Sequence, residues 1–184
     1  DITFDGGNYV RCGDKVVMTD KIFMENPQWR ATDLLAHLEE KLQAEIVLLP
    51  WDMAEFCGHS DGMVAYLGDG QVLLNGCWEN KDKKFHSRLV KILKGRFGED
   101  KVKVLSLGSE LENKYTWCYL NYLKLPGAVL LPRLAADDAD ENDKFRACDD
   151  AAVAAFKVLF PNDEIEIKQV YAMPLVKKGG ALHC

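Results

Sequence analysis

The stretch GHSDG at residues 58–62 places a histidine and an aspartate two positions apart. Side chains alternate between the two faces of an extended strand, so His59 and Asp61 would lie on the same face of such a strand. A base and a carboxylate would then share one site, which is an arrangement that can move protons and bind a cation.

Cys184 supplies a thiol that such a base could help to ionise. Cysteine chemistry needs a thiolate. A nearby imidazolium lowers the pKa of a thiol, and the same imidazole can pass a proton to a leaving group. Asp5 is a candidate to orient His59 and to stabilise its charge, as the third member does in other sets of nucleophile, base and acid. We therefore predict a catalytic set of Cys184, His59 and Asp5.

Polar residues of this kind recur at intervals of about sixty residues, which suggests a repeated structural unit. If the units are related by rotation about an axis, equivalent positions in their first strands converge on that axis. We therefore expect side chains that are far apart in the sequence to meet. In chain order they are Asp5 and Asn8, His59 and Asp61, Asn121, and Cys184.

The elements around these residues also recur in one order, namely a polar strand, a glycine-containing turn, an apolar strand, a polar loop, an amphipathic helix and a short apolar strand. The predicted hairpin turns are Cys12-Gly13-Asp14-Lys15, Leu67-Gly68-Asp69-Gly70 and Leu125-Pro126-Gly127-Ala128. The helical stripes are Leu34, Leu35, Leu38 and Leu42; Phe85, Leu89, Ile92 and Leu93; and Phe145, Cys148, Ala152, Phe156 and Leu159. The closing strands are Ile46–Leu49, Val102–Leu105 and Ile165–Val170. We expect one α/β domain over 1–184, with units at approximately 1–50, 51–107 and 108–172 and a further unit that opens at 173–184.

Composition excludes several classes of partner. The net charge of −6 and the lack of a Lys/Arg cluster argue against a nucleic-acid partner and fit a cationic small substrate better. No apolar run approaches the roughly 20 residues that span a bilayer, so no membrane partner is expected. The six cysteines form no CxxC pair, and most of them are expected to be small buried side chains.

Other chemistries fit the pattern less well. His59, Asp61 and Cys184 could together bind zinc, but no familiar zinc spacing is present, so no metal site is predicted. No G-x-S-x-G turn surrounds the serines, and glycine-rich phosphate loops are absent. His183 neighbours Cys184 and would point to the opposite face of a strand, so it is expected to be a bystander. A lone cysteine or histidine is also often purely structural.

Five motifs, DGGN, GHSDGMV, YLNYL, VLLP and the final GGALHC, follow one another along the chain. In this order they resemble the active-site motifs of the agmatine deiminase and Porphyromonas-type peptidylarginine deiminase family. The resemblance implies the pentein fold, a five-bladed α/β propeller with its active site on the central axis. About three of the five blades would lie in this chain.

The resemblance also implies roles. Cys184 matches the family nucleophile, His59 the general acid/base and Asp61 a carboxylate that grips a guanidinium. Asp5 falls where the family has an acidic residue that supports the histidine, and Asn121 and Asn8 are predicted as substrate contacts. No metal or organic cofactor is required. A further substrate-binding aspartate that the family has upstream finds no matching motif here.

Two functions remain open from the sequence. The first is a deiminase that hydrolyses the guanidinium group of agmatine, or of an arginine residue in a peptide, to a ureido product and ammonia. The second is a noncatalytic guanidinium-binding or structural relative. The first would be cytoplasmic if agmatine is the substrate, and secreted or periplasmic if peptidyl-arginine is. The sequence leaves open whether the chain is an oligomer.

Overall fold

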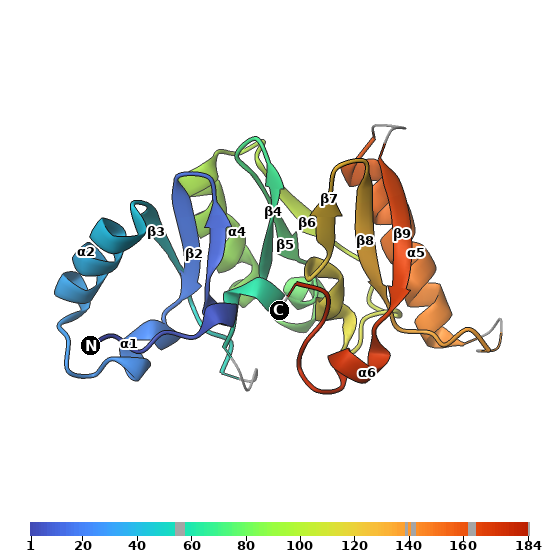
Figure 1. Cartoon of the computed structure of the whole chain (residues 1–184), viewed down its shortest axis with the longest axis horizontal. Helices are drawn as coiled ribbons and strands as arrows, with labels where there is room; N and C mark the ends of the chain where they lie inside the picture. The colour runs from blue at the N-terminus through green and yellow to red at the C-terminus, as the bar shows by residue number, and fades with distance from the viewer. Residues whose placement is uncertain (54–57, 139, 141–142, 162–164, 184) are drawn as a thin grey trace. The chain divides into compact units, whose positions relative to one another are not determined.

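The computed structural model describes residues 1–53, 58–138, 140, 143–161 and 165–183. It is an α/β structure that contains three small sheets of three strands each (Figure 1). Cys184 and Cys57 lie outside the described residues. The predicted recurrence of a hairpin, a helix and a closing strand is confirmed in all three sheets.

The first repeat contains β1 (Val10–Cys12), β2 (Lys15–Thr19), α1 (Lys21–Glu25), α2 (Ala31–Leu42) and β3 (Glu45–Leu49). The antiparallel pair β1 and β2 is followed by a parallel pair, β2 and β3. A parallel neighbour needs a crossover connection, and α2 lies in that connection.

The second repeat has the same order and contains β4 (Val64–Gly68), β5 (Gln71–Asn75), α3 (Trp78–Lys81), α4 (Lys83–Phe97) and β6 (Val102–Leu105). β4 and β5 are antiparallel. The amide of Val72 donates to Lys101 O (3.0 Å) and the amide of Gly76 donates to Leu105 O (2.9 Å). These two bonds advance in the same direction along both strands, so β5 and β6 run parallel.

The third repeat contains β7 (Leu123–Leu125), β8 (Ala128–Arg133), α5 (Lys144–Leu159), β9 (Glu166–Tyr171) and then α6 (Met173–Val176). β7 and β8 are antiparallel, and β8 and β9 are parallel. Asp143, from a segment rich in acidic residues, caps α5 because its carboxylate accepts from the amides of Phe145 (2.7 Å) and Arg146 (3.3 Å).

The three predicted hairpin turns have two residues each, and each contains a residue with positive φ. The values are 68° at Gly13, 50° and 72° at Asp69 and Gly70, and 76° at Gly127. Glycine adopts this region at little cost, which explains its place in every one of these turns.

The prediction that the polar site residues lie on the first strands is wrong. The five of them that the structure describes lie in or beside 3₁₀ turns that precede those strands, namely η1 (Gly6–Asn8), η2 (Ser60–Gly62) and η3 (Thr116–Leu120). Bonds of short sequence separation, such as that from Asn8 N to Asp5 O (2.9 Å), close these turns. The alternation of an extended strand therefore does not govern His59 and Asp61.

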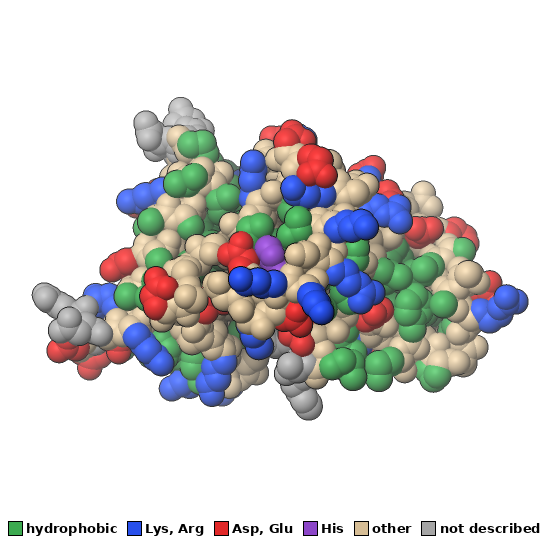
Figure 2. All heavy atoms as spheres, turned by 180° about the vertical axis from the view of Figure 1, so that it is seen from behind, with side chains coloured by type: hydrophobic (Ala, Val, Ile, Leu, Met, Phe, Trp, Pro, Cys, Tyr) green, Lys and Arg blue, Asp and Glu red, His purple; other side chains and the backbone are tan. Residues whose placement is uncertain are grey.

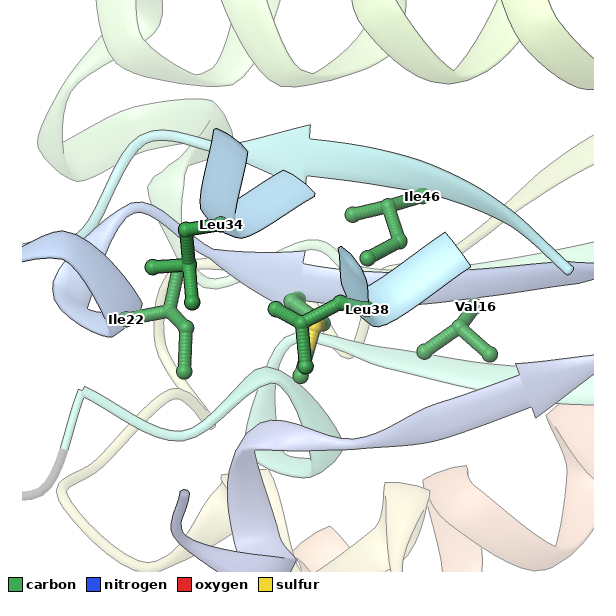
Figure 3. Packing of buried hydrophobic residues seen from close by; sticks show 6 residues of the cluster. Val16, Ile22, Leu34, Leu38 and Ile46 are labelled. Carbon is green, nitrogen blue, oxygen red and sulfur yellow. The ribbon is translucent and has the colours of Figure 1, made fainter. Parts of the chain in front are cut away.

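A hydrophobic cluster joins α2 to the first sheet (Figure 3). Leu34 and Leu38 lie four residues apart on one face of α2 and are buried, while Leu35 and Leu42 of the predicted stripe are partly buried against the same cluster. Burial of one such side chain contributes roughly 1.5–3 kcal/mol. The cluster fixes β2, the strand that leads into α1. Its members are Val16, Met18, Ile22, Leu34, Leu38 and Ile46.

The chain forms two compact units. The first comprises Asp1–Leu74 and Asp82–Val104, and the second comprises Asn75–Lys81 and Leu105–Cys184. Within the described residues no helix is long and apolar enough to cross a membrane. Acidic and basic side chains are interspersed on the face that Figure 2 shows.

Candidate active site

The first compact unit brings together Asp5 and His59, which are far apart in the sequence. His59 Nε2 lies 2.9 Å from Asp5 Oδ2. Each residue stands directly before a 3₁₀ turn, and their backbone angles are nearly equal, with φ −91° and ψ 127° at Asp5 and φ −84° and ψ 134° at His59. Equivalent positions of two repeats therefore supply a carboxylate and an imidazole that contact each other.

Both side chains remain accessible to solvent. The side chain of His59 is 26% exposed and that of Asp5 is 45% exposed. The hydrogen bond with His59 is the main reason that the pKa of Asp5 lies below its ordinary value of 3.8, although partial burial acts in the opposite direction. Asp5 is thus an anion over the whole neutral pH range and can stabilise a positive charge on the imidazole.

Gly7 lets the imidazole lie against the backbone of η1. A Cβ atom at Gly7 would fall on the ring of His59, only 2.7 Å from both Cγ and Cε1. A real Cβ atom essentially never approaches another heavy atom so closely. Any larger residue at this position would therefore displace either the turn or the imidazole.

Thr19, at the end of β2, anchors both turns. Its hydroxyl lies 2.7 Å from Gly58 O, to which it donates, and its amide donates to Asn8 Oδ1 (2.7 Å). Ser60 adds a bond from its hydroxyl to Val17 O (3.1 Å). These bonds are buried, so the strand that the hydrophobic cluster fixes also holds the backbone on either side of the His59–Asp5 contact.

Asn8 is fully buried and faces Thr19. Besides the bond from the Thr19 amide, its side-chain Nδ2 lies 3.4 Å from Thr19 O. These contacts hold η1 on β2. The substrate contact predicted for Asn8 stays a prediction.

A lysine that the sequence analysis did not select also contacts Asp5. Lys21 Nζ lies 3.3 Å from Asp5 Oδ2 and 2.9 Å from Glu25 Oε1. Burial acts to lower the pKa of Lys21, but the hydrogen bonds and the attraction to Glu25 and Asp5 outweigh it, so this pKa is raised. The only hint in the sequence is the spacing of four residues between Lys21 and Glu25.

Two further predicted residues, Asp61 and Asn121, are buried. Asp61 lies within η2 and is only 8% exposed. Asn121 belongs to the second unit, where it is buried and closes η3 with a bond from its amide to Cys118 O (2.9 Å). The predicted nucleophile Cys184 lies outside the described residues. Its role, like those of Asp61 and Asn121, stays a prediction.

No metal cluster is visible where the chain is described, since no group of three or more His, Cys, Asp or Glu side chains gathers there in a way that could hold an ion. Of the three zinc ligands considered from the sequence, Cys184 lies outside that part.

Comparison with solved structures identifies the fold. The agmatine deiminase of C. jejuni matches with a TM-score of 0.71 and 19% identity over 100% of this chain and 55% of its own. The agmatine deiminase of Enterococcus faecalis matches with a TM-score of 0.70 and 20% identity over 97% of this chain and 55% of its own. The N-terminal domain of the cyanobacterial arginine dihydrolase ArgZ matches with a TM-score of 0.57 and 14% identity over 100% of this chain and 55% of its own. The chain thus spans about half the length of these relatives.

These matches define a class of protein. The repeated hairpin, helix and parallel strand form part of the pentein α/β propeller, as the sequence predicted. The chain belongs to the Porphyromonas-type peptidyl-arginine deiminase family, whose profile matches residues 1–184. No curated protein sequence matches it.

Proposed function

We propose that the protein hydrolyses a C–N bond of a guanidinium group and leaves a ureido product and ammonia. The observation that carries this proposal is the contact between His59 and Asp5 from equivalent positions of two repeats. An imidazole oriented by a carboxylate is suited to general acid/base catalysis. The family to which the chain belongs, and its solved relatives among agmatine deiminases and arginine dihydrolases, support a guanidinium compound as substrate.

In the first half of the proposed reaction, the thiolate of Cys184 attacks the central guanidinium carbon and an S–C bond forms. The protonated imidazole of His59 gives its proton to one amino nitrogen. The C–N bond then breaks, its electron pair stays with that nitrogen, and ammonia leaves. An amidino group remains on the sulfur as a covalent intermediate.

In the second half, the now neutral His59 takes a proton from water while the oxygen of that water bonds to the same carbon. The C–S bond breaks and its electron pair returns to the sulfur. The hydroxyl group on the same carbon gives its remaining proton to solvent as the C=O bond forms, and the neutral ureido product is released. Asp5 stabilises the imidazolium in each half. The scheme requires no metal and no organic cofactor.

The contacts of His59 suggest which ring nitrogen moves the proton. Asp5 lies against Nε2, so Nδ1 is the nitrogen left for exchange with substrate and water. A Cβ atom at Gly7 would fall on Nδ1, so the glycine leaves this position free of a side chain. The glycine of the DGGN motif thus makes room for the ring.

Asp61 is the proposed anchor for the guanidinium. A carboxylate can accept two parallel N–H bonds from the planar cation, which fixes its orientation for attack. Burial strengthens such a pair because little water competes for it. Asn121 is proposed as a further substrate contact. For Asn8, the bonds to Thr19 favour a role in holding η1.

Two substrate classes fit the proposal, free agmatine and an arginine residue of a peptide. A serine-for-cysteine variant of the C. jejuni agmatine deiminase has been solved with substrate bound, which supports the first. The name of the matched family supports the second.

The test is an assay for ureido product with the complete protein, offering agmatine, free arginine and a peptide with C-terminal arginine. We expect product from one substrate class and a loss of roughly 10⁴-fold or more in Cys184→Ala. The matched control is Cys77→Ala, because Cys77 is a half-buried cysteine with no proposed role. If no substrate gives product while a guanidinium ligand still binds, the protein is a binding module instead.

A further inference from the structure

Four side chains of alternating charge form a line in the first compact unit. Glu25 pairs with Lys21, Lys21 pairs with Asp5, and Asp5 contacts His59. The proposed chemistry uses only the last two. Lys21 and Glu25 lie four residues apart on α1, so their pairing is local, whereas the contacts with Asp5 and His59 join α1 to the two turns.

Lys21 and His59 share one oxygen atom of Asp5. Both contacts end on Oδ2, at 3.3 Å from Nζ and 2.9 Å from Nε2. The carboxylate of Asp5 is 45% exposed, and a half-exposed carboxylate held by one partner can rotate into solvent. A second partner on the same oxygen restricts that rotation, and the ammonium group of Lys21 has three donors, so it can bond to two carboxylates.

Glu25 keeps Lys21 in this position. The side chains of Lys21 and Glu25 are only 16% and 18% exposed. Glu25 Oε2 is buried and has no hydrogen-bond partner among the described residues. A buried carboxylate depends strongly on its remaining ion pair, so the Glu25–Lys21 contact is costly to break.

The line also sets the charge that His59 experiences. When His59 is protonated, the four charges cancel, and when it is neutral, one negative charge is left. Without Lys21 these sums become −1 and −2, so a protonated imidazole is favoured. Without the charge of Glu25 they become +1 and 0, so the neutral imidazole is favoured.

We infer that Lys21 is a positioning residue, which fixes Asp5 Oδ2 against His59 and balances the Asp5 charge, and that Glu25 sets the strength of this effect. The inference rests on the proposed function for its catalytic meaning. Its electrostatic content does not depend on the substrate and can be measured without one.

The experiment follows the protonation of His59 by NMR in the complete protein labelled at histidine. The chain has four histidines, and a His59→Gln variant identifies the signal. We expect Lys21→Met to move the titration midpoint of His59 to higher pH by roughly 0.5–1 pH unit. Glu25→Gln should move it to lower pH by less, and Lys21→Arg, which keeps the charge, should stay near the parent protein.

Opposite directions in the two variants support the inference, because general loss of structure would not produce them. An unchanged midpoint in Lys21→Met, or shifts of equal sign in Lys21→Met and Glu25→Gln, would overturn it. The ureido assay separates this result from the proposed function. Opposite shifts without product from any substrate leave the inference standing and refute the deiminase, while product with an unmoved midpoint refutes the inference alone.

Discussion

Asp5 and Asp149 are two carboxylates with opposite surroundings. Asp5 is half exposed and contacts the side chains of Lys21 and His59, and its pKa is lowered, chiefly by the hydrogen bond with His59. Asp149, on α5, is 2% exposed, and burial raises its pKa despite the bonds it accepts. One aspartate is therefore placed for exchange with solvent and ligands, and the other is enclosed in the fold.

The bonds of Asp149 show what the enclosed carboxylate does. It accepts from Tyr119 Oη (2.7 Å) and from the amides of Leu134 (2.8 Å) and Ala135 (2.8 Å). One side chain thus ties α5, η3 and the backbone after β8 together. The two residues are of the same type, so their different roles follow from their different exposure and their different hydrogen-bond partners.

The thiols of the described residues extend this contrast. Burial raises the pKa of Cys12 to about 12 and also raises that of Cys148. A thiol that stays protonated at neutral pH is a poor nucleophile. These cysteines belong with Asp149 as packed groups, as the sequence analysis expected for most of them.

The strongest test of the contrast is removal of the imidazole. His59→Gln should lower kcat by roughly 10²–10⁴-fold, because general acid/base catalysis is lost, with little change in the free energy of unfolding. Steady-state kinetics and urea unfolding measure the two effects. His37→Gln is the control, since His37 is a partly buried histidine that stacks on Trp29 at 5.2 Å. Equal kinetic losses in both variants would contradict the role of His59.

Asp149→Asn should give the reverse pattern. An amide places donors where backbone amides already donate, so the free energy of unfolding should fall by about 2–4 kcal/mol. Asp150→Asn, an exposed neighbour on α5, is the control. Activity of the folded fraction should be retained, and a protein of parental stability would refute the structural role of Asp149.

The two aspartates should also respond to pH with opposite sign. The pKa of Asp149 is raised in the folded state, so its contribution to stability is full below about pH 4 and is lost as pH rises through the folded-state pKa. The pKa of Asp5 is lowered, so its contribution is present above about pH 4 and is lost as pH falls through the folded-state pKa. Unfolding curves of Asp149→Asn and Asp5→Asn between pH 3 and 7 measure these trends. If the stability contributions of both aspartates changed with pH in the same direction, the contrast between the two carboxylates would be refuted.

The smallest expected effect comes from the glycine beneath the imidazole. Gly7→Ala should lower kcat by about 10-fold, because the new methyl group displaces His59. Gly6→Ala is a matched control, since a Cβ there meets no atom within 4 Å among the described residues. Equal activity in the two variants would show that His59 adapts without loss.

The sequence predicted the elements well where a local signal exists. Glycines with positive φ mark the three hairpin turns, and leucines four residues apart mark the buried face of α2. The prediction that the site residues lie on the first strands was wrong. A 3₁₀ turn of three residues is too short to produce a periodic sequence pattern that would predict it. The pairing of Asp5 with His59 was anticipated from the recurrence of the units.

What the sequence did not reveal depends on contacts between distant segments. Asp149 interrupts an apolar stripe, and only its three donors explain its burial. Lys21 looks like an ordinary surface charge until α1 places it beside Asp5. Such residues have roles that no single segment encodes.

The matching backbone angles at Asp5 and His59 have a consequence for how this chain can be varied. Perfectly symmetric repeats would put the same side chain at both positions, and two acids or two imidazoles would then face each other. An acid–base couple requires that the copies differ at this one place. Making the repeats more alike, as consensus design does, would therefore preserve the scaffold while erasing the couple.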